Sequence, residues 1–473
     1  MTAPKKVGLD LTEGNIFHQL IIFVMPLLLA NFVQQFYNTV DMVVIGQFVG
    51  SAASNGVSNG GEVASLITFF ASAFGSAGQI YVAQLYGAKD YKAINETLST
   101  SMILMGIVSV VGAVSSIVFC DQLLTWLNCP VEAFSHARDY MILVSLGLPG
   151  VFGYNMVCGI LRGMGEAKRP LLFVTVAAIS NIIMDILLVV VIPLGAAGTA
   201  IATIIAQYAS FVAAAVFLYK RKDQFDLRFT KESLKMKPIR LKALMQLGIP
   251  LTTQTALIHV TLLICASHIN AFGLVASTAN SIGNRITKMV SIFTSSLNQG
   301  GGAMVGQNIG AKKYDRVKKI VYTTMGCAAV FAMLSSSLAV FAPNEVYSLF
   351  LVDSDPNYEA ILELGAVYLR YHVIIFACSI FQGSYMSVVN GSGNSKLNML
   401  AGLLDGVFLR LGFSFLFAYT LGMGIEGFFL GNGLARLGPI TVGMVYFYSG
   451  KWKSYNLLQR IGDEKQQKQE VHQ

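Results

Sequence analysis

The chain has 473 residues, of which 54% are hydrophobic and only 12% are charged. This charged fraction is about half that of an ordinary soluble protein, which excludes a large soluble core and is typical of a polytopic membrane protein. The formal net charge is +8. The basic residues are distributed as in a membrane protein with a defined topology, so the charge does not indicate a nucleic-acid partner.

Segments that are apolar and long enough to cross a bilayer recur twelve times, since about 20 residues suffice for a transmembrane helix. The longest gap between them, 220–243, is polar and basic and lies at the midpoint of the chain. We therefore predict an all-α membrane protein with an N-terminal tail (1–15), a six-helix N-lobe (16–219), a cytoplasmic linker (220–243), a six-helix C-lobe (244–449) and a C-terminal tail (450–473). The twelve predicted spans are 16–43, 53–84, 98–120, 137–162, 171–193, 197–219, 244–271, 276–307, 320–342, 359–389, 397–421 and 424–449.

The basic residues favour one side of the membrane. Alternate gaps, counted from the N-terminus, contain 27 of the 33 lysines and arginines, whereas the other gaps contain Arg138 and many acids. By the positive-inside rule, both termini are predicted to be cytoplasmic, and an even number of spans agrees with that. The first span has no small-residue cleavage site, so we expect it to remain in the protein. The basic gaps are expected to face anionic lipid headgroups.

The two halves repeat each other at an offset that stays between 223 and 229 residues. Several matches in the same order indicate a duplication, and because each half begins and ends inside, the repeats are parallel. Such a pair leaves a cleft between the lobes that can open to either side. The matches are Gln84–Tyr91 with Gln307–Tyr314, Gly163–Lys168 with Gly391–Lys396, Gly195–Gly198 with Gly424–Gly427, Pro26 with Pro250, and Tyr140 with Tyr368.

A polar face runs along the first predicted helix. Asn31, Gln34, Asn38 and Asp41 follow a spacing of three to four residues and therefore share one side. A carboxylate within a membrane span costs about 2.5–3.5 kcal/mol on insertion scales, so it is rarely present without a use. The pattern predicts a binding site inside a transporter, and the alternative is a polar face that only joins helices.

A second buried carboxylate is predicted in the fifth span, where Asn181 and Asp185 are four residues apart. Thr199 and Thr203 have the same spacing in the sixth span. Together with Asp41 they offer carboxylate, amide and hydroxyl oxygens, which suit a hard cation or a proton. We predict a coupling-ion site for H+ or Na+ here. The alternative is that Asp185 only pairs with a hydroxyl and has a structural role. Glu62 is expected to be solvated near the outer mouth, or else to join this cavity.

The C-lobe differs in charge. The counterparts of Asp41 and Asp185 are Cys265 and Ser414, and the counterpart of Glu62 is Arg285. We expect Asp405 to form a structural pair with one of the buried arginines, a second proton site being the alternative. His259 and His268 are expected to be satisfied by neighbouring groups. The charges of this lobe that we expect to be buried are Arg285, Lys288, Arg370, Asp405, Arg410 and Arg436.

Glycine and proline positions predict close packing and bending. Gly302, Gly306 and Gly310 form a row of small residues, which favours close helix contact. Pro26 and Pro149 permit kinks in the first and fourth helices.

The chain lacks GxxxxGK[ST] and HExxH sequences, and we predict that it is not an enzyme. The six cysteines are scattered and predict neither a disulfide framework nor a zinc site. We expect no cofactor beyond the coupling ion.

The repeated architecture, the Gly-Ala-Lys loops after the second and eighth helices, and the Asn181-x-x-x-Asp185 sequence followed by Gly198-x-x-x-x-Thr203 resemble the MATE (multidrug and toxic compound extrusion) family. The likeness covers about residues 12–450. An acidic first helix with an acid-free seventh helix is similar to the DinF-like branch, whereas NorM-like members have further carboxylates in the seventh and tenth helices.

The resemblance implies secondary active efflux of bulky, often cationic, amphipathic compounds in exchange for H+ or Na+. It also implies that the coupling site lies in the N-lobe at Asp41, Asn181, Asp185, Thr203 and Thr199, with Gln34 and Tyr140 in the same cavity. We further expect Asn31, Asn38 and Asn155 to line this cavity. We expect a monomer in the bacterial inner membrane whose partners are drugs or dyes and the bilayer. The alternative cargo is a lipid or a lipid-linked oligosaccharide, moved by a flippase of the same superfamily.

Overall fold

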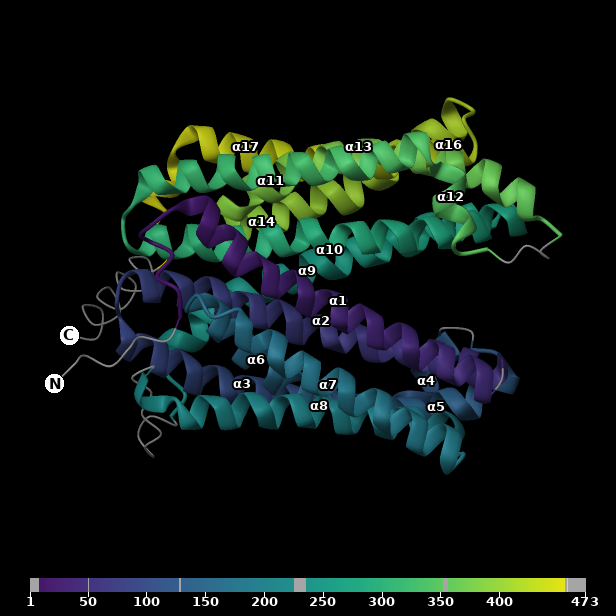
Figure 1. Ribbon diagram of the computed structural model, residues 1–473, viewed down its shortest axis with the longest axis horizontal. Coiled ribbons are helices and arrows are strands. Elements are labelled where there is room, and N and C mark those ends of the chain that lie inside the picture. Colours follow the sequence, from purple (N-terminus) through teal and green to yellow (C-terminus); the bar gives the residue numbers. More distant parts are fainter. Residues whose placement is uncertain are drawn as a thin grey trace. The chain divides into compact units, whose positions relative to one another are not determined.

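The computed structural model of the chain describes residues 8–49, 51–126, 129–224, 235–351, 356–455 and 457. Throughout these residues the secondary structure is helical, and no strand occurs in them (Figure 1). The described residues divide by their contacts into two compact units, which we call the first and the second unit. The first unit contains Ile21–Ile249, and the second contains Thr12–Leu20 and Pro250–Arg460.

The helices of the N-terminal half follow the predicted order. Short elements occur where the chain turns between spans. The helices are α1 (Ile16–Phe48), α2 (Ser51–Gly87), α3 (Tyr91–Val118), α4 (Cys120–Trp126), α5 (Val131–Leu146), α6 (Leu148–Gly163), α7 (Lys168–Asp185), the π-helix η1 (Ile186–Val191), α8 (Gly195–Lys220) and the short 3₁₀-helix η2 (Lys222–Gln224).

The C-terminal half repeats this order with more interruptions. Its eleventh span combines α-helical and π-helical turns. The elements are α9 (Pro238–Asn270), α10 (Leu274–Gly310), α11 (Tyr314–Phe341), α12 (Pro343–Ser348), α13 (Tyr358–Ser392), α14 (Ser395–Gly402), η3 (Leu403–Leu411), α15 (Gly412–Phe415), η4 (Leu416–Thr420), α16 (Ile425–Leu434), α17 (Leu437–Ser449) and α18 (Lys451–Ser454).

Each of the twelve predicted segments corresponds to one helical rod, which is either a single helix or several helical elements in succession. The predicted fold class is confirmed. Among the described residues, nine rods are long and apolar enough to cross a membrane, and α5 with α6 forms a tenth that bends by 48°. The bend falls at Gly147, just before Pro149, which confirms the kink predicted for the fourth span. The remaining two, α2 and α10, have 37 residues each and are less apolar because they are rich in glycine, serine and asparagine.

The duplication is visible in the backbone. The loops that follow α2 and α10 place Lys89 at φ 60° and Lys312 at φ 58°, a left-handed conformation that only these two residues and Pro193 adopt among the described non-glycine residues. Both lysines occupy the same position of the repeated Gly-Ala-Lys sequence. Two non-glycine residues with the same rare conformation in matching turns are a structural trace of the repeat, since such a conformation costs roughly 1–2 kcal/mol.

The boundary between the units lies inside helices and not in a loop. The start of α9 packs within the first unit, where Arg240 Nε lies 3.1 Å from Glu96 Oε2 and Arg240 Nη1 donates to Tyr81 Oη at 2.6 Å. The start of α1 packs within the second unit, where Lys313 Nζ donates to the Thr12 carbonyl at 3.0 Å and Arg316 Nη1 donates to the Gly14 carbonyl at 2.9 Å. Residues 225–234 of the predicted linker and most of the C-terminal tail lie outside the described residues.

Glycines allow helices to approach closely inside each unit. In the second unit, a Cβ atom on Gly391 of α13 would lie 2.9 Å from the Gly306 nitrogen of α10. In the first unit, a Cβ on Gly159 of α6 would lie 3.1 Å from Gly75 Cα of α2. The close packing predicted from the Gly302–Gly306–Gly310 row is confirmed at Gly306, and no larger side chain fits at either contact.

Candidate ion-coupling site in the first unit

Four helices of the first unit converge on the predicted coupling residues. Helix α1 supplies Asp41, α7 supplies Asn181 and Asp185, α8 supplies Thr199 and Thr203, and α5 supplies Tyr140. Helices α1, α2, α5 and α8 are held together by an apolar cluster, which includes Ile45, Val57, Val144 and Ala200. Because Ile45 is four residues beyond Asp41, this cluster fixes the turn of α1 that carries the carboxylate.

The backbone changes its winding where the second acid lies. Asp185 is the last residue of α7, and the chain continues without a break into the π-helix η1. π-helical turns are rare and occur often at functional sites, because the wider turn displaces side chains from their α-helical register. Asn181 and Asp185 still lie on the same face, one α-helical turn apart, and neither side chain is exposed at all.

The Asp41 carboxylate lies close to the side chains of Asp185 and Asn181. The Tyr140 hydroxyl lies beside Thr203 and close to both carboxylates. The structure therefore brings together residues that are up to 162 positions apart in the chain, between Asp41 and Thr203. Two carboxyl groups so close together in a buried pocket cannot both hold a full negative charge without a bound cation or proton.

Many polar atoms of this cluster receive no hydrogen bond of good geometry from the residues that the structure describes. Buried polar atoms are nearly always paired, so a group of them in one place indicates a place for water or an ion. Every oxygen in the group is one that a hard cation accepts as a ligand. The oxygens are Asp41 Oδ1, Asn181 Oδ1, both Asp185 carboxylate oxygens, Thr199 Oγ1 and Thr203 Oγ1.

Not every predicted residue joins the cluster. Gln34 and Asn38 are exposed on α1, and Asn31 is half-buried. Asn155 is half-buried and donates through Nδ2 to the Val151 carbonyl of its own helix at 2.9 Å. The side chain of Glu62 lies outside the described residues.

One neighbour of the site was not predicted from the sequence. Tyr37 of α1 lies close to Asp41 and to Tyr140. It is four residues before Asp41, so the same helical spacing that selected Asn38 and Asp41 could have found it. It was missed because a tyrosine in an apolar span has the composition of an ordinary core or lipid-facing residue.

The C-terminal half has no acidic pair at the matching place. The counterparts Cys265 and Ser414 lie together, with 4.0 Å between Sγ and Oγ. Asp405 forms an ion pair with Arg410, with Oδ1 2.6 Å from Nη2 and both side chains 7% exposed, so the predicted structural pair is confirmed. The prediction that Arg285, Lys288 and Arg370 are buried is wrong, because all three are exposed. His268 lies 3.0 Å from the Tyr419 hydroxyl through Nδ1, which confirms that a neighbour satisfies it. All six cysteines are free.

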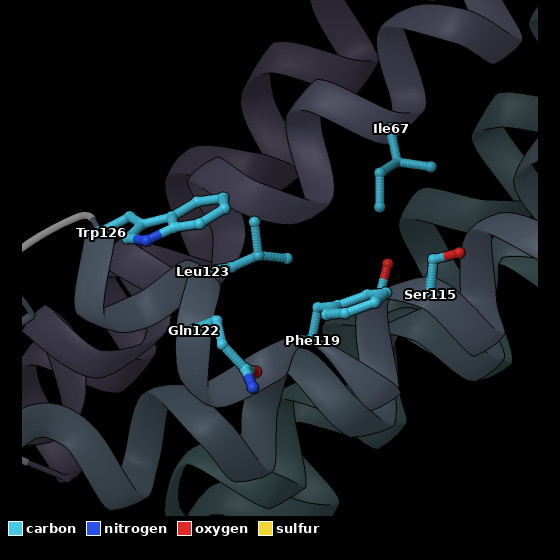
Figure 2. A pocket seen from close by; sticks show the side chains of 7 residues that line it. Ile67, Ser115, Phe119, Gln122, Leu123 and Trp126 are labelled. Atoms are coloured by element: carbon cyan, nitrogen blue, oxygen red, sulfur yellow. The ribbon is translucent and has the colours of Figure 1, made fainter.

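A separate apolar pocket of about 510 Å³ lies in the first unit and contains none of the predicted site residues. Figure 2 shows Ile67 of α2 facing Leu123 and Trp126 of α4 across it. Within the described residues, no group of three or more histidine, cysteine or acidic side chains could hold a metal ion.

The family model described as MatE matches residues 26–187 and 250–419, which together make up more than half of the chain. The chain belongs to the MatE family. The two matched segments correspond to the two repeats, and the first contains Asp41, Asn181 and Asp185. As a MatE protein the chain is a multi-pass membrane protein of a transporter family.

Relatives and solved structures of similar length agree with this assignment. The MatE chain is 27% identical to the probable multidrug resistance protein YoeA of Bacillus subtilis over 74% of its length and 76% of the relative. It is 24% identical to the probable multidrug resistance protein YpnP of the same organism, over 95% and 98% of the two chains.

Two solved structures share the fold at low sequence identity. An outward-facing multidrug resistance MATE family transporter of the MOP superfamily matches with a TM-score of 0.88 and 19% identity, over 95% of this chain and 99% of the other. A MOP superfamily transporter from Pyrococcus furiosus, described as having a binding pocket of reverse polarity, matches with a TM-score of 0.86 and 20% identity over 97% and 99%.

Proposed function

We propose that this protein exports bulky amphipathic, often cationic, compounds in exchange for H+ or Na+. The observation that carries the proposal is the buried cluster of Asp41, Asn181 and Asp185, whose oxygens lack hydrogen-bond partners in the described part of the chain. Such a cluster is costly in a membrane protein and is stabilised by a bound cation or proton. The names of two relatives, YoeA and YpnP, describe probable multidrug resistance proteins, which supports a drug as cargo.

In the proposed mechanism, the coupling ion acts through its different affinity for two conformations. With the cleft open to the outside, Na+ or H+ binds at Asp41 and Asp185 and favours release of the substrate. With the cleft open to the cytoplasm, the ion leaves and a new substrate binds. An ion that bound both conformations equally would shift nothing, so the site must change its geometry between them.

The residues of the site have separate roles in this proposal. Asp41 and Asp185 supply the charge, while Asn181, Thr199 and Thr203 supply neutral oxygens. Tyr140 positions the Thr203 hydroxyl. Gln34, Asn31, Asn38 and Asn155 are proposed to face the substrate. The proposal places the protein as a monomer in the inner membrane, with both termini in the cytoplasm.

The decisive experiment measures dye efflux by the purified protein in proteoliposomes, with the Na+ gradient and the pH gradient imposed separately. We expect Asp41→Asn and Asp185→Asn to abolish ion-driven efflux, because each removes a charge that the ion neutralises. The matched control is Asp121→Asn, since Asp121 is an exposed acid of the same unit in a surface ion pair with Arg138. Efflux that survives the two site substitutions together would overturn the proposal.

The alternative is a flippase for a lipid or a lipid-linked oligosaccharide. The buried arginines of the second unit, Arg410 and Arg436, favour it, since guanidinium groups bind phosphates and carboxylates. The same proteoliposomes discriminate the two functions. A flippase would move a fluorescent headgroup-labelled lipid between leaflets, and its rate would not depend on an added dye.

A further inference from the structure

The second unit contains the duplicated counterpart of the ion-coupling site, and its residue types are changed in a consistent direction. The offset that pairs Asp185 with Ser414 also pairs Asn181 with Arg410 and Thr203 with Asn432. Asp41 corresponds to Cys265. The duplication therefore replaced both carboxylates with neutral groups and replaced the amide between them with a guanidinium. Where the first unit has an acidic cluster, the second has a basic one.

The structure brings these counterparts together as it does the original residues. The thiol of Cys265 contacts the Ser414 hydroxyl at 4.0 Å and lies within electrostatic range of Arg410. Arg410 and Ser414 are on neighbouring turns of the eleventh span, and Asn432 is on α16. Helix α16 packs very closely here, because a Cβ atom on Gly431 would lie 2.6 Å from Ser414 Cα.

A second arginine joins the cluster at a break in the last span. Arg436 lies between α16 and α17, four residues beyond Asn432. A Cβ atom on the nearby Gly438 would lie 2.9 Å from Leu404 Cβ, so the break lies directly against η3. Arg436 is within electrostatic range of Asp405 and Arg410, and its Nη1 donates to Gln382 Oε1 at 2.9 Å.

The charges of this cluster do not balance. Arg410 and Arg436 are permanently charged guanidiniums, and of the groups that act electrostatically on Arg436 within the described residues, only Asp405 is an acid. The other titratable neighbours are His372, Cys378 and Cys265, and an imidazole or an ordinary thiol is not an anion at neutral pH. Among these neighbours the two arginines face a single acid, and a buried charge without a partner destabilises a protein.

The donors that remain open identify the missing ligand. Asp405 Oδ1 accepts from Arg410 Nη2, but the buried Nε atoms of Arg410 and Arg436 meet no acceptor among the residues that the structure describes. The Arg410 side chain is only 7% exposed. A guanidinium edge that offers a free Nε–H binds a carboxylate or a similar planar oxyanion in a fixed geometry.

We infer that the second unit binds an anionic group at Arg410 and Arg436, at the duplicated counterpart of the cation site. The ligand is a monoanion, either the carboxylate of an amphipathic substrate or a free inorganic anion. This inference goes beyond the proposed cation exchange and does not rest on it. It gives the two halves opposite charge preferences, so that a zwitterionic or anionic compound has a binding place that a purely cationic compound lacks.

Binding to the purified full-length protein in detergent tests the inference without any transport. The probes are a xanthene dye that carries a free carboxylate and its methyl ester, measured by fluorescence polarisation at constant ionic strength. We expect the carboxylate dye to bind at least about tenfold more tightly than the ester, which corresponds to about 1.4 kcal/mol. Arg436→Gln should remove this preference and leave the affinity for the ester unchanged. Arg370→Gln, which changes an exposed arginine of α13, should keep it.

Competition distinguishes the two sources of the anion. Displacement of the carboxylate dye by both acetate and chloride means that inorganic anions also bind, and displacement by acetate alone means that the site selects carboxylates. Either result supports the site. Equal affinity for the dye and its ester in the wild-type protein, or an equal loss of preference in Arg370→Gln, overturns it.

A second variant tests the charge imbalance directly and does not remove a buried arginine. Cys378 lies beside Arg436, so Cys378→Asp supplies an internal carboxylate. We expect this variant to lose the preference for the carboxylate dye and to unfold at no lower temperature than the wild type. The matched control Cys378→Asn has the same shape without the charge and should keep the preference. If Cys378→Asp lowers the unfolding temperature, as a buried acid without a positive partner would, the cluster has no excess positive charge and the inference is wrong.

Discussion

At the scale of single residues, the chain concentrates its buried oxygens in one place. Asp41, Asp185 and Asn181 come from two helices that are far apart in the sequence, yet their side chains interact directly. Each would destabilise a membrane helix alone, and most of their oxygens receive no hydrogen bond of good geometry from the described residues. A bound ion would satisfy several of them at once, which is why the cluster is a better explanation than separate structural roles.

The hydroxyl of Thr203 gives the first test at this scale. We expect Thr203→Val to raise the half-saturating concentration of the coupling ion about tenfold, because one oxygen ligand worth roughly 1.5 kcal/mol is lost while the side-chain shape is kept. Thr203→Ser should restore the wild-type value. The measurement is the ion dependence of dye efflux in proteoliposomes.

A matched control for this test lies on α7. The Thr175 hydroxyl is bonded to the Leu171 carbonyl of its own helix at 2.8 Å, so Thr175→Val should leave the ion dependence unchanged. An unchanged ion dependence in Thr203→Val would remove Thr203 from the set of ligands.

At the scale of elements, π-helical turns occur at equivalent places in the two halves. The π-helix η1 follows Asp185, while η3 and η4 flank Ser414 on both sides. In η3, Asp405 and Arg410 are five residues apart and bond to each other. Five residues is the hydrogen-bond spacing of a π-helix, whereas in an α-helix this spacing would point the two side chains in different directions. The winding of η3 therefore determines which arginine Asp405 neutralises.

The contact between α16 and the eleventh span gives a test at the scale of elements. A Cβ atom on Gly431 would lie 2.6 Å from both Ser414 Cα and Oγ, whereas a Cβ on Gly412 meets nothing within 4 Å. We expect Gly431→Ala to destabilise the protein by about 1–3 kcal/mol through overpacking. Gly412→Ala should be neutral or slightly stabilising, since alanine favours a helix over glycine.

The thermal unfolding temperature of the two purified variants measures this difference under the same detergent conditions. Equal unfolding temperatures for the two variants would mean that α16 is not packed against Ser414 as closely as described. The two substitutions add the same methyl group within the same half of the chain, so any difference reports the space around each glycine.

At the scale of the whole molecule, the division into two units does not coincide with the ends of helices. Helix α9 begins in the first unit, where Arg240 is paired with Glu96, and continues in the second from Pro250. Helix α1 begins with the second unit and continues in the first. Each of these helices contains a proline, Pro26 in α1 and Pro250 in α9, which permits a kink in the helix.

The orientation of the chain in the membrane gives the test at this scale. We expect a cysteine introduced at Lys312 to react with a membrane-impermeant maleimide only from the cytoplasmic side, and one at Asp121 only from outside. Both positions are exposed, and the six native cysteines are first replaced. We expect Lys312 on the cytoplasmic side because the gaps that include it contain an excess of lysine and arginine. Labelling of both cysteines from the same side would contradict the twelve-span topology.

The sequence alone determined the helical fold, the duplication and most members of the polar cluster in the first unit. Hydrophobicity and repeat spacing are local or periodic properties, so they identify spans and show that Asn181 and Asp185 share a face. Asp41 stood out because a carboxylate in an apolar span is expensive wherever the helix lies. For the same reason Gln34 and Asn38 were predicted together with Asp41, although the structure leaves their side chains exposed.

Only the tertiary structure decided which residues meet across helices. It placed Tyr37 and Tyr140 beside the acids and selected Arg410 as the partner of Asp405. It also brought Arg436 close to Asp405 and Arg410 at the duplicated site. These contacts depend on the π-helical turns and on the glycines that allow close approach. Neither feature alters the hydrophobicity pattern that is used to predict the membrane spans. Composition and spacing determine what each helix must bury, and the packing of several helices determines which buried group meets which.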